Sequence, residues 1–397
     1  MTAANPAGAA SEDQTRVLAA GAGAQTGRRC TLLGTRALVV GDTGTAEATD
    51  HLRRTVEGVR EAGVQVDTAV LPPEEPATVA GARTVHDRMR RCGAEVLVAV
   101  GGGSVIDSAK LARTAFHEPW VLDRALWHRP SGLFALREPR PCRTRPPLVA
   151  VPTRPGSAAE VTDRVAVAPE AGTSRRLLTG ETLRPNEALI DPLFSATLSR
   201  SDWFSSLAEI LFRVLGPFLI TQDSTDEIDR AAAAWVDELL GIGVHLAGGD
   251  APTARQRLRV AEISVATATG DHVRRWAPRM AAWWCVQNTV AARTGFAKGR
   301  LSALALPTLL ELAASGEPAF GLPERLEALR SRTAAVEERL EHVCRAAQEA
   351  GGLRGRSYPD EELVSWGREV HRLWRHHPHV AALGPGGVVE LLRRVGF

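Results

Sequence analysis

The chain of 397 residues is 44% hydrophobic and 24% charged with a formal net charge of +2, which predicts a globular protein of two domains without strong attraction for nucleic acid or anionic membranes. Its five cysteines are widely spaced and form no C-x-x-C pair, which argues against a disulfide framework or a zinc finger. No apolar run reaches the roughly 18 residues of a membrane span, so we expect a cytoplasmic protein.

The first 28 residues predict a mobile tail, because they lack the basic start and the apolar core of a signal peptide. Strands and helices then alternate along the chain. Buried strands are expected at 36–42, 64–72 and 94–100, with helical spacing at 45–63 and 76–93 between them. This β-α-β-α-β order predicts a parallel sheet.

Residues 117–148 break the alternation, because they are rich in Pro, Arg and Trp and have too little periodicity for a long helix. We expect an insertion on the rim of the sheet, placed to cover the site either as a lid or as a docking surface. The sheet resumes at 148–153. A hairpin is expected from the segments 163–170 and 174–180, and a last short strand at 187–192.

After about residue 193 the strand patterns stop and helical patterns replace them. The expected helices are 203–221, 225–248, 253–270, 275–294, 299–314, 323–350 and 360–376. The sequence therefore predicts an α/β domain over 29–193 followed by an all-α domain over 194–397.

The stretch "GGGSVIDSAK" (101–110) connects the third strand to a helix. Three glycines let the backbone approach a phosphate, toward which the helix points its N–H groups, and Ser104 can add a hydroxyl donor. Asp42, at the end of the first strand, is placed to accept ribose hydroxyls and would repel a 2′-phosphate, so it favours NAD over NADP. The spacing is not G-x-G-x-x-G, and the glycines alone are equally compatible with a simple tight turn.

Together with two later motifs, this stretch resembles the iron-containing (group III) alcohol dehydrogenase family. "VPTRPGSAAEVT" (151–162) is similar to that family's VPTTAGTGSEVT, and "RPNEALIDPLFSATLS" (184–199) is similar to its P-x-x-A-x-x-DP-x-x-x-x-x-LP. The resemblance implies the dehydroquinate synthase-like fold, with a Rossmann-like N-terminal domain, an all-α C-terminal domain, a nicotinamide cofactor in the cleft between them, and a homodimer.

The resemblance also implies a set of NAD-binding positions. Asp42 would take the adenosine ribose, and Asp107 would lie near the nicotinamide ribose. The remaining positions would hold the pyrophosphate or line the cofactor groove, and they are Gly101, Gly102, Gly103, Ser104, Thr153, Ser157 and Arg175. One departure is Arg154 followed by Pro155, where the family has Thr and Ala, so we expect a reshaped loop.

Relatives of this kind hold iron or zinc with one Asp and three His of the helical domain. Here Glu209 takes the Asp position, and Arg213, Trp284 and Lys298 take histidine positions. Guanidinium and ammonium groups repel a divalent metal and indole does not bind one, so we expect no metal. His272 is the nearest histidine, and its polar surroundings in the sequence favour a surface residue.

Fixed cations are expected to replace the metal. Lys298 can polarise or protonate a carbonyl oxygen, and a neighbouring Arg213 would depress its pKa so that it acts as acid and base. Glu209 would hold these two cations in place. The alternatives are that Glu209 and Arg213 form an ordinary ion pair one helical turn apart, and that Lys298 is a surface lysine.

These features predict a metal-independent, NAD-dependent dehydrogenase that oxidises a secondary alcohol. Arg213, Lys298 and Arg300 predict a carboxylate on its substrate, which is either a small molecule or a peptide C-terminus, and a β-keto acid product would lose CO2 readily. In lacking the metal ligands, the chain resembles the dehydrogenases of daptide-type peptide clusters. Those enzymes take part in converting a C-terminal Thr of a peptide to an aminoketone. The alternatives are a zinc-requiring cyclase of the dehydroquinate synthase type, a metal-free reductase of the maleylacetate reductase type, and a non-catalytic relative.

Overall fold

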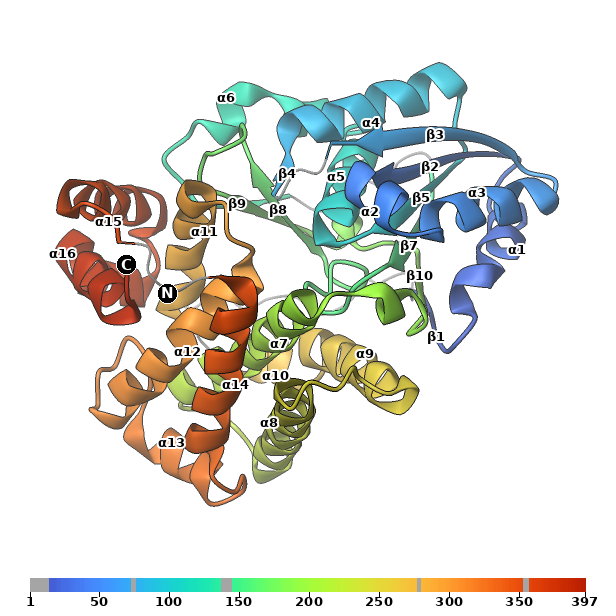
Figure 1. Cartoon of the computed structure of the whole chain (residues 1–397). Helices are drawn as coiled ribbons and strands as arrows, with labels where there is room; N and C mark the ends of the chain where they lie inside the picture. Colours follow the sequence, from blue (N-terminus) through green and yellow to red (C-terminus); the bar gives the residue numbers. More distant parts are fainter. Residues whose placement is uncertain (1–13, 73–75, 137–144, 277–279, 353–356) are drawn as a thin grey trace.

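The computed structural model describes residues 14–72, 76–136, 145–276, 280–352 and 357–397, which form an α/β half and a helical half (Figure 1). The α/β half contains a six-stranded parallel sheet with the order β1-β10-β7-β5-β2-β3. Its strands are β1 (Thr15–Leu18), β2 (Arg36–Asp42), β3 (Gln65–Leu71), β5 (Val96–Gly101), β7 (Leu148–Pro152) and β10 (Glu187–Ile190). The predicted parallel sheet is therefore confirmed.

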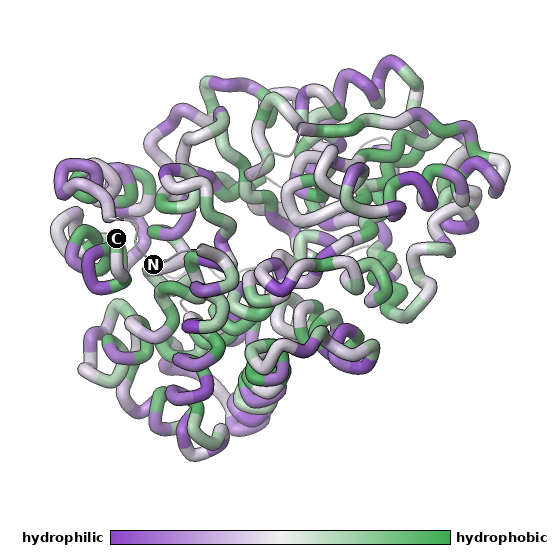
Figure 2. The backbone as a smooth tube through the Cα atoms, viewed as in Figure 1, coloured by the Kyte–Doolittle hydropathy of each residue, from purple (hydrophilic) through white to green (hydrophobic). Residues whose placement is uncertain are grey.

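Helices cover this sheet on both faces, because successive side chains of each strand point in opposite directions. The helices of this half are α1 (Thr26–Thr31), α2 (Thr43–Ala48), α3 (His51–Glu61), α4 (Val79–Cys92) and α5 (Gly103–Thr114). Leu38 and Val40 of β2 pack with side chains of α4 and α5, whereas Ala37 and Val39 pack with side chains of α1 and α3. Burial on both faces explains why the central strands β5 and β7 carry no polar side chain. Green, hydrophobic segments run through the sheet in Figure 2.

The prediction of a mobile tail over residues 1–28 is wrong for the part that the structure describes. Strand β1 forms the edge of the sheet and pairs in parallel with β10. Arg29 of α1 makes a bidentate ion pair with the buried Glu187, with N···O distances of 2.6 and 2.5 Å, and Cys30 is fully buried. Residues 1–13 lie outside the described residues.

A second sheet of four strands, ordered β4-β8-β9-β6, lies beside the first. Its strands are β4 (Ala77–Thr78), β6 (Leu133–Ala135), β8 (Arg164–Ala168) and β9 (Arg176–Thr179). The antiparallel pair β8–β9 confirms the predicted hairpin. The described part of the 117–148 insertion supplies β6 and the fully buried Trp127, and Gly132 donates its N–H to Leu373 of the helical half.

The last strand ends at Ile190, and the long helices begin at Arg200. The helices of this half are α7 (Arg200–Ile220), α8 (Asp226–Ala247), α9 (Ala254–Thr269), α10 (His272–Arg275), α11 (Ala282–Thr294), α12 (Lys298–Ala314), α13 (Pro323–Arg330), α14 (Val336–Gly351), α15 (Asp360–Trp374) and α16 (Pro378–Val395). The single helix expected at 323–350 is divided at Ala335, whose φ is 48°. Helix α16 was not predicted, because its sequence contains the helix-breaking Gly384 and Pro385.

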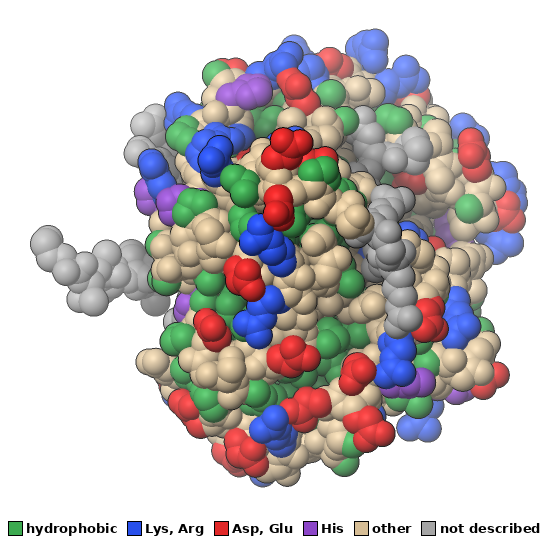
Figure 3. Space-filling view, turned by 60° about the vertical axis from the view of Figure 1, so that its left-hand side comes forward, with side chains coloured by type: hydrophobic (Ala, Val, Ile, Leu, Met, Phe, Trp, Pro, Cys, Tyr) green, Lys and Arg blue, Asp and Glu red, His purple; other side chains and the backbone are tan. Residues whose placement is uncertain are grey.

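Helix α7 is the central helix of this half and is long and apolar enough to cross a membrane by length and composition. Its most apolar window is, however, 83% buried inside the protein, where it forms part of the largest hydrophobic cluster. On the face drawn in Figure 3, positive and negative side chains are interspersed, as expected for a chain with 48 Lys and Arg and 46 Asp and Glu.

The close contact of α1 with α3 tests whether residues near position 27 belong to the fold. A Cβ added at Gly27 would lie 2.2 Å from the carbonyl oxygen of Gly58, so Gly27→Ala should lower the free energy of unfolding by about 1–3 kcal/mol. A Cβ at Gly58 meets nothing within 4 Å, so Gly58→Ala should instead stabilise helix α3 by about 1 kcal/mol. Denaturant titration measures both changes, and a neutral Gly27→Ala would mean that this segment is a tail after all.

Candidate active site

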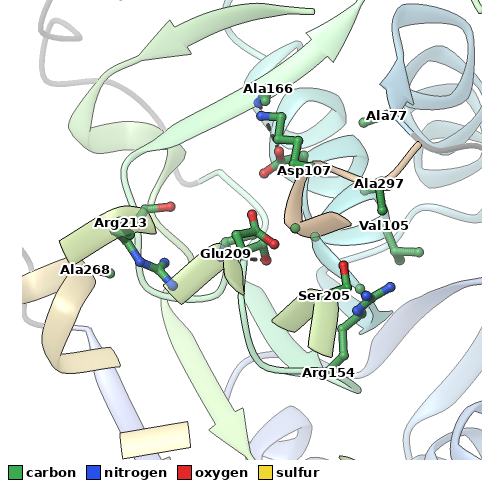
Figure 4. A pocket seen from close by; sticks show the side chains of 18 of the residues that line it. Ala77, Val105, Asp107, Arg154, Ala166, Ser205, Glu209, Arg213, Ala268 and Ala297 are labelled. Carbon is green, nitrogen blue, oxygen red and sulfur yellow. Dashed lines mark hydrogen bonds between the residues drawn. The ribbon is translucent and has the colours of Figure 1, made fainter. Parts of the chain in front are cut away.

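A cavity of about 570 Å³ lies between the two halves. Its wall combines the carboxyl ends of β2 and β7, the start of α5, the strands β8 and β9, and side chains of α7, α9, α11 and α12. Ligands of parallel α/β sheets bind outside the carboxyl ends of the strands, so this is where a dinucleotide would be expected. Figure 4 shows several of the residues around it, including Asp107, Arg154, Glu209 and Arg213.

The three glycines make the tight turn that the sequence predicts. A Cβ at Gly101 would come within 2.7 Å of the Val105 side chain, and one at Gly103 would come within 2.7 Å of the Ser157 hydroxyl oxygen. Gly102 is the N-cap of α5, no side chain caps this helix, and Gly102, Gly103 and Ser104 line the cavity. Gly101 does not line it, because it is the buried last residue of β5.

Asp42 lies at the carboxyl end of β2 and lines the cavity, as the sequence predicts. Its Oδ1 accepts the backbone N–H of Thr45 at 2.7 Å, and its Oδ2 accepts the Thr45 hydroxyl at 3.0 Å. Asp42 is thereby the N-cap of α2, which orients its carboxylate. Each carboxylate oxygen keeps a further lone pair, so the group can also accept hydroxyl hydrogens of a ribose.

Asp107 lines the cavity and is held by its second carboxylate oxygen. Its Oδ2 accepts the N–H of Ala166 at 2.9 Å, whereas its Oδ1 is buried without a hydrogen-bond partner within the described residues. Burial raises the pKa of Asp107, and the charges of Lys110, Lys298 and Arg175 oppose this shift. The structure therefore brings Asp107 together with two of the predicted cations, Lys298 and Arg175.

Lys298 begins α12 and lines the cavity with its Nζ 5.2 Å from the centroid of the Trp284 ring, a cation–π contact. The next residue must be glycine, because a Cβ at Gly299 would lie 1.9 Å from the carbonyl oxygen of Ser205 in α7. Trp284 packs in turn edge-on against Trp374, with ring centroids 5.5 Å apart. Lys298 thus lies where α12 packs closely against α7, rather than on an open surface.

Glu209 and Arg213 both line the cavity, and the ordinary ion pair that was the alternative interpretation of their spacing does not form between these two described residues. Arg213 instead donates from Nη2 to the carbonyl oxygen of Gly156 and contacts the Ser264 hydroxyl at 3.5 Å. Burial lowers the pKa of Arg213, against the opposing charges of Glu209 and Glu160. The structure therefore ties Arg213 to the loop through the carbonyl of Gly156 rather than to Glu209 through an ion pair.

The remaining predicted cofactor residues also line the cavity, and they are Thr153, Ser157 and Arg175. Arg300 does not line it, although the sequence placed it on the cleft side. His272 is 4% exposed and lines the cavity with its Nε2 3.0 Å from the Thr267 carbonyl oxygen, so its expected surface position is wrong. Burial lowers the pKa of His272, which favours the neutral ring.

The residues at the family's metal positions do not fit a metal. They combine one carboxylate, that of Glu209, with the cations of Arg213 and Lys298 and the indole of Trp284, and a transition metal needs several carboxylate, imidazole or thiolate ligands. Within the described ranges, no group of three His, Cys, Asp or Glu residues lies close enough to hold a metal ion.

Comparison with known proteins relates this cavity to a family. Residues 14–192 match the family model described as iron-containing alcohol dehydrogenase. An alcohol dehydrogenase of Thermococcus barophilus is 24% identical over 171 residues, 43% of each chain, and a 1,3-propanediol dehydrogenase of Klebsiella pneumoniae is 36% identical over 141 residues, 34% of this chain and 33% of that protein. Each match spans less than half of the curated relative.

Solved structures match over nearly the whole chain. The NADH-dependent butanol dehydrogenase A of Thermotoga maritima superposes with a TM-score of 0.77 at 16% identity and covers 97% of both chains. An iron-containing alcohol dehydrogenase of Thermococcus thioreducens gives a TM-score of 0.71 at 18% identity, covering 96% of this chain and 98% of the other. These matches show the fold, and with the family model they confirm the resemblance read from the motifs.

The ammonium group of Lys110, three residues beyond Asp107, offers a pH test of the packing around this site. Lys110 is fully buried, its Nζ donates to the carbonyl oxygens of Thr162 and Arg164 at 2.9 and 3.1 Å, and burial lowers its pKa to about 8. Between pH 8 and 10.5 the unfolded chain binds a proton that the folded protein has lost. Rising pH in this window therefore favours folding, by up to about 1.4 kcal/mol per pH unit.

The variant Lys110→Met should abolish this contribution to the pH dependence. Urea unfolding of the parent and the variant at several pH values between 8 and 10.5 isolates the lysine, because all other titrating groups are shared. Parallel pH profiles would show that Lys110 titrates as an ordinary lysine.

Proposed function

We propose that this chain, whose residues 14–192 match the iron-containing alcohol dehydrogenase model, is an NAD-dependent oxidoreductase that acts on a CH–OH group without a metal. The observation that supports this most directly is one continuous cavity. It has a glycine turn and Asp42 at one end, and it has Lys298 where a metal ligand would otherwise lie. In this proposal the glycine turn and Asp42 would form the dinucleotide cradle of a dehydrogenase, and Lys298 would form its electrophilic centre.

The NAD site is proposed on the residues that line the α/β side of the cavity. Asp42 would accept the adenosine ribose hydroxyls, the N–H groups at the start of α5 would bind the pyrophosphate, and Asp107 would face the nicotinamide ribose. Thr153, Ser157 and Arg175 would line the rest of the groove. When bound, NAD accepts a hydride from the alcohol carbon, and the protein has to remove the hydroxyl proton.

Proton removal falls to Lys298 in this proposal. Its neutral amine takes the proton of the substrate hydroxyl, and the resulting ammonium stabilises the oxygen of the ketone. The indole of Trp284 holds the lysine side chain in place and keeps water away from its flank. Arg213 is already bonded to the carbonyl of Gly156, so its role is to position the loop rather than to exchange a proton.

The charge of the cavity supports a substrate with a carboxylate. The helical side of the cavity contributes two cations, Arg213 and Lys298, and one carboxylate close to Arg213 in the chain, Glu209. Arg164 of the second sheet and Arg175 of the turn before β9 add two further cations to the lining. If the alcohol is β to the carboxylate, oxidation gives a β-keto acid. Loss of CO2 then leaves an enolate that the Lys298 ammonium can protonate, so that an oxidative decarboxylation is complete.

We further propose that the substrate is a small hydroxy acid or the C-terminus of a peptide, as in the daptide-type clusters that the lost ligands resemble. A cytoplasmic homodimer remains our expectation from that resemblance. A dehydroquinate synthase-like cyclase requires zinc, which these residues do not fit, and it would return its cofactor oxidised. A reductase of the maleylacetate reductase type would use the same residues in reverse, so accumulation of NADH during turnover identifies the oxidative direction.

The first prediction of the proposed function concerns metal content. The purified protein should contain far less than one equivalent of iron or zinc per chain, because Arg213 and Lys298 occupy ligand positions. Elemental analysis measures this, and chelator treatment should leave turnover unchanged. One tightly held metal per chain, with activity lost on chelation, would contradict the proposed mechanism.

The second prediction concerns cofactor choice. Asp42→Asn retains an N-cap for α2 but removes the negative charge, so it separates capping from charge repulsion. The preference for NAD over NADP should fall by about 1–3 kcal/mol, since one charge-assisted hydrogen bond to the ribose is weakened. Calorimetric titration with both dinucleotides measures the preference, and equal affinity of the parent protein for the two would refute the role of Asp42.

The third prediction concerns catalysis. Lys298→Met keeps a side chain of similar length against Trp284 but removes the amine, and we expect kcat to fall by roughly 10²–10⁴ while NAD affinity changes little. Lys298→Arg should not restore the rate, because a guanidinium stays protonated. Arg300→Met, on the same helix but outside the cavity wall, is the matched control. Turnover of Lys298→Met within threefold of the parent would exclude the lysine as the proton acceptor.

A further inference from the structure

We infer that Arg154 binds the diphosphate of the dinucleotide and does so by exchanging its contact with Asp202 for the phosphate oxygens. The inference rests on the proposed function, because it assigns a further residue to the NAD site. Arg154 stands where the related motif has a threonine, so it is a feature of this chain rather than of the motif.

The position of Arg154 is set by the loop that follows β7. This loop lies directly over the glycine turn. Its Ser157 fills the space in which a Gly103 side chain would be, and the Cδ of Arg154 lies 3.5 Å from the position of a Cβ at Gly102. Pro155 keeps the preceding residue out of the helical region. The aliphatic stem of Arg154 therefore crosses the N-terminus of α5, where the proposed diphosphate would be bound, and the residue lines the cavity.

The guanidinium of Arg154 has donors available. Within the part of the chain that the structure describes, it makes no hydrogen bond, and its single ionic contact joins Nη2 to Asp202 Oδ1 at 3.6 Å, beyond hydrogen-bonding distance. The side chain is only 28% exposed. Other enclosed arginines of this protein bond to backbone carbonyls, as Arg113 does to Arg184 at 2.8 Å and Arg213 does to Gly156.

A planar fork of N–H donors beside an anion cradle matches phosphate oxygens in shape and charge. When Arg154 leaves Asp202 for the phosphate, the Asp202 carboxylate still has hydrogen-bond partners. Asp202 lies in the first turn of α7, and its Oδ2 accepts the hydroxyl of Ser199 at 2.6 Å independently of Arg154. The Asp202 carboxylate is 35% exposed, so water can replace the arginine. Arg154 is thus held loosely near the position that a diphosphate would occupy.

Calorimetric titration with ADP and with adenosine tests the inference on the full chain without any turnover. Arg154→Thr, which restores the residue of the related motif, should weaken ADP binding about tenfold to hundredfold and adenosine binding less than twofold. The affinity of the variant for ADP should also depend less steeply on salt, since one ionic contact is lost. Arg275→Thr is the matched control, because it removes an arginine paired with Asp223 at 3.2 Å outside the cavity.

Asp202→Asn tests the exchange itself. Releasing Arg154 from its competitor should tighten ADP binding by up to about fivefold, as expected for a partly exposed ion pair. Weaker ADP binding by this variant would overturn the exchange. Equal ADP affinity of Arg154→Thr and the parent would overturn the inference alone, whereas failure of the parent to bind either ligand would overturn the NAD site and the inference together.

Discussion

Two helices, one from each half, bind the same short stretch of backbone, and the geometry of the whole cavity depends on this. From α5, Asp107 accepts the N–H of Ala166 and Lys110 donates to the carbonyls of Thr162 and Arg164. From α7, Arg213 donates to the carbonyl of Gly156. Charged groups away from water are tolerated only when they are hydrogen-bonded, so the segment 156–166 cannot shift without leaving several charges unpaired.

This arrangement explains how the fold is kept although the residues at the metal-ligand positions do not bind a metal. A metal would tie the helical half to the cleft through side chains, whereas here the guanidinium of Arg213 ties α7 to the loop through a main-chain carbonyl. The charges of Lys298 and Arg175, which also line the cavity, act on the buried Asp107. In the proposed mechanism, Arg213 would take the structural role of a metal and Lys298 its chemical role.

The sequence predicted the sheet and the hairpin well, and most of the proposed cofactor residues line one cavity, because each of these features depends on local patterns. Alternating apolar strands and the glycine run are properties of neighbouring residues. The errors concern residues whose partners are distant. The spacing of Glu209 and Arg213 is compatible with an ion pair, but the carbonyl of Gly156 binds the arginine instead. His272 has polar neighbours in sequence, yet it is enclosed by Trp235 and Trp276, with ring centroids 5.2 and 4.9 Å away.

The loop after β7 contains a strained backbone position, and the hydrogen bonds of Arg213 and Lys110 hold the loop in this conformation. Ala158 has a φ of 54°, a left-handed conformation that costs an alanine about 1–2 kcal/mol, at a position where the related motif has glycine. The loop keeps this conformation because Gly156 is bound by Arg213 on one side and Thr162 and Arg164 by Lys110 on the other. Ser157, between them, then stays packed against Gly103. The buried charges therefore preserve the conformation of the glycine turn, the proposed site of the diphosphate, even though the motif around it has diverged.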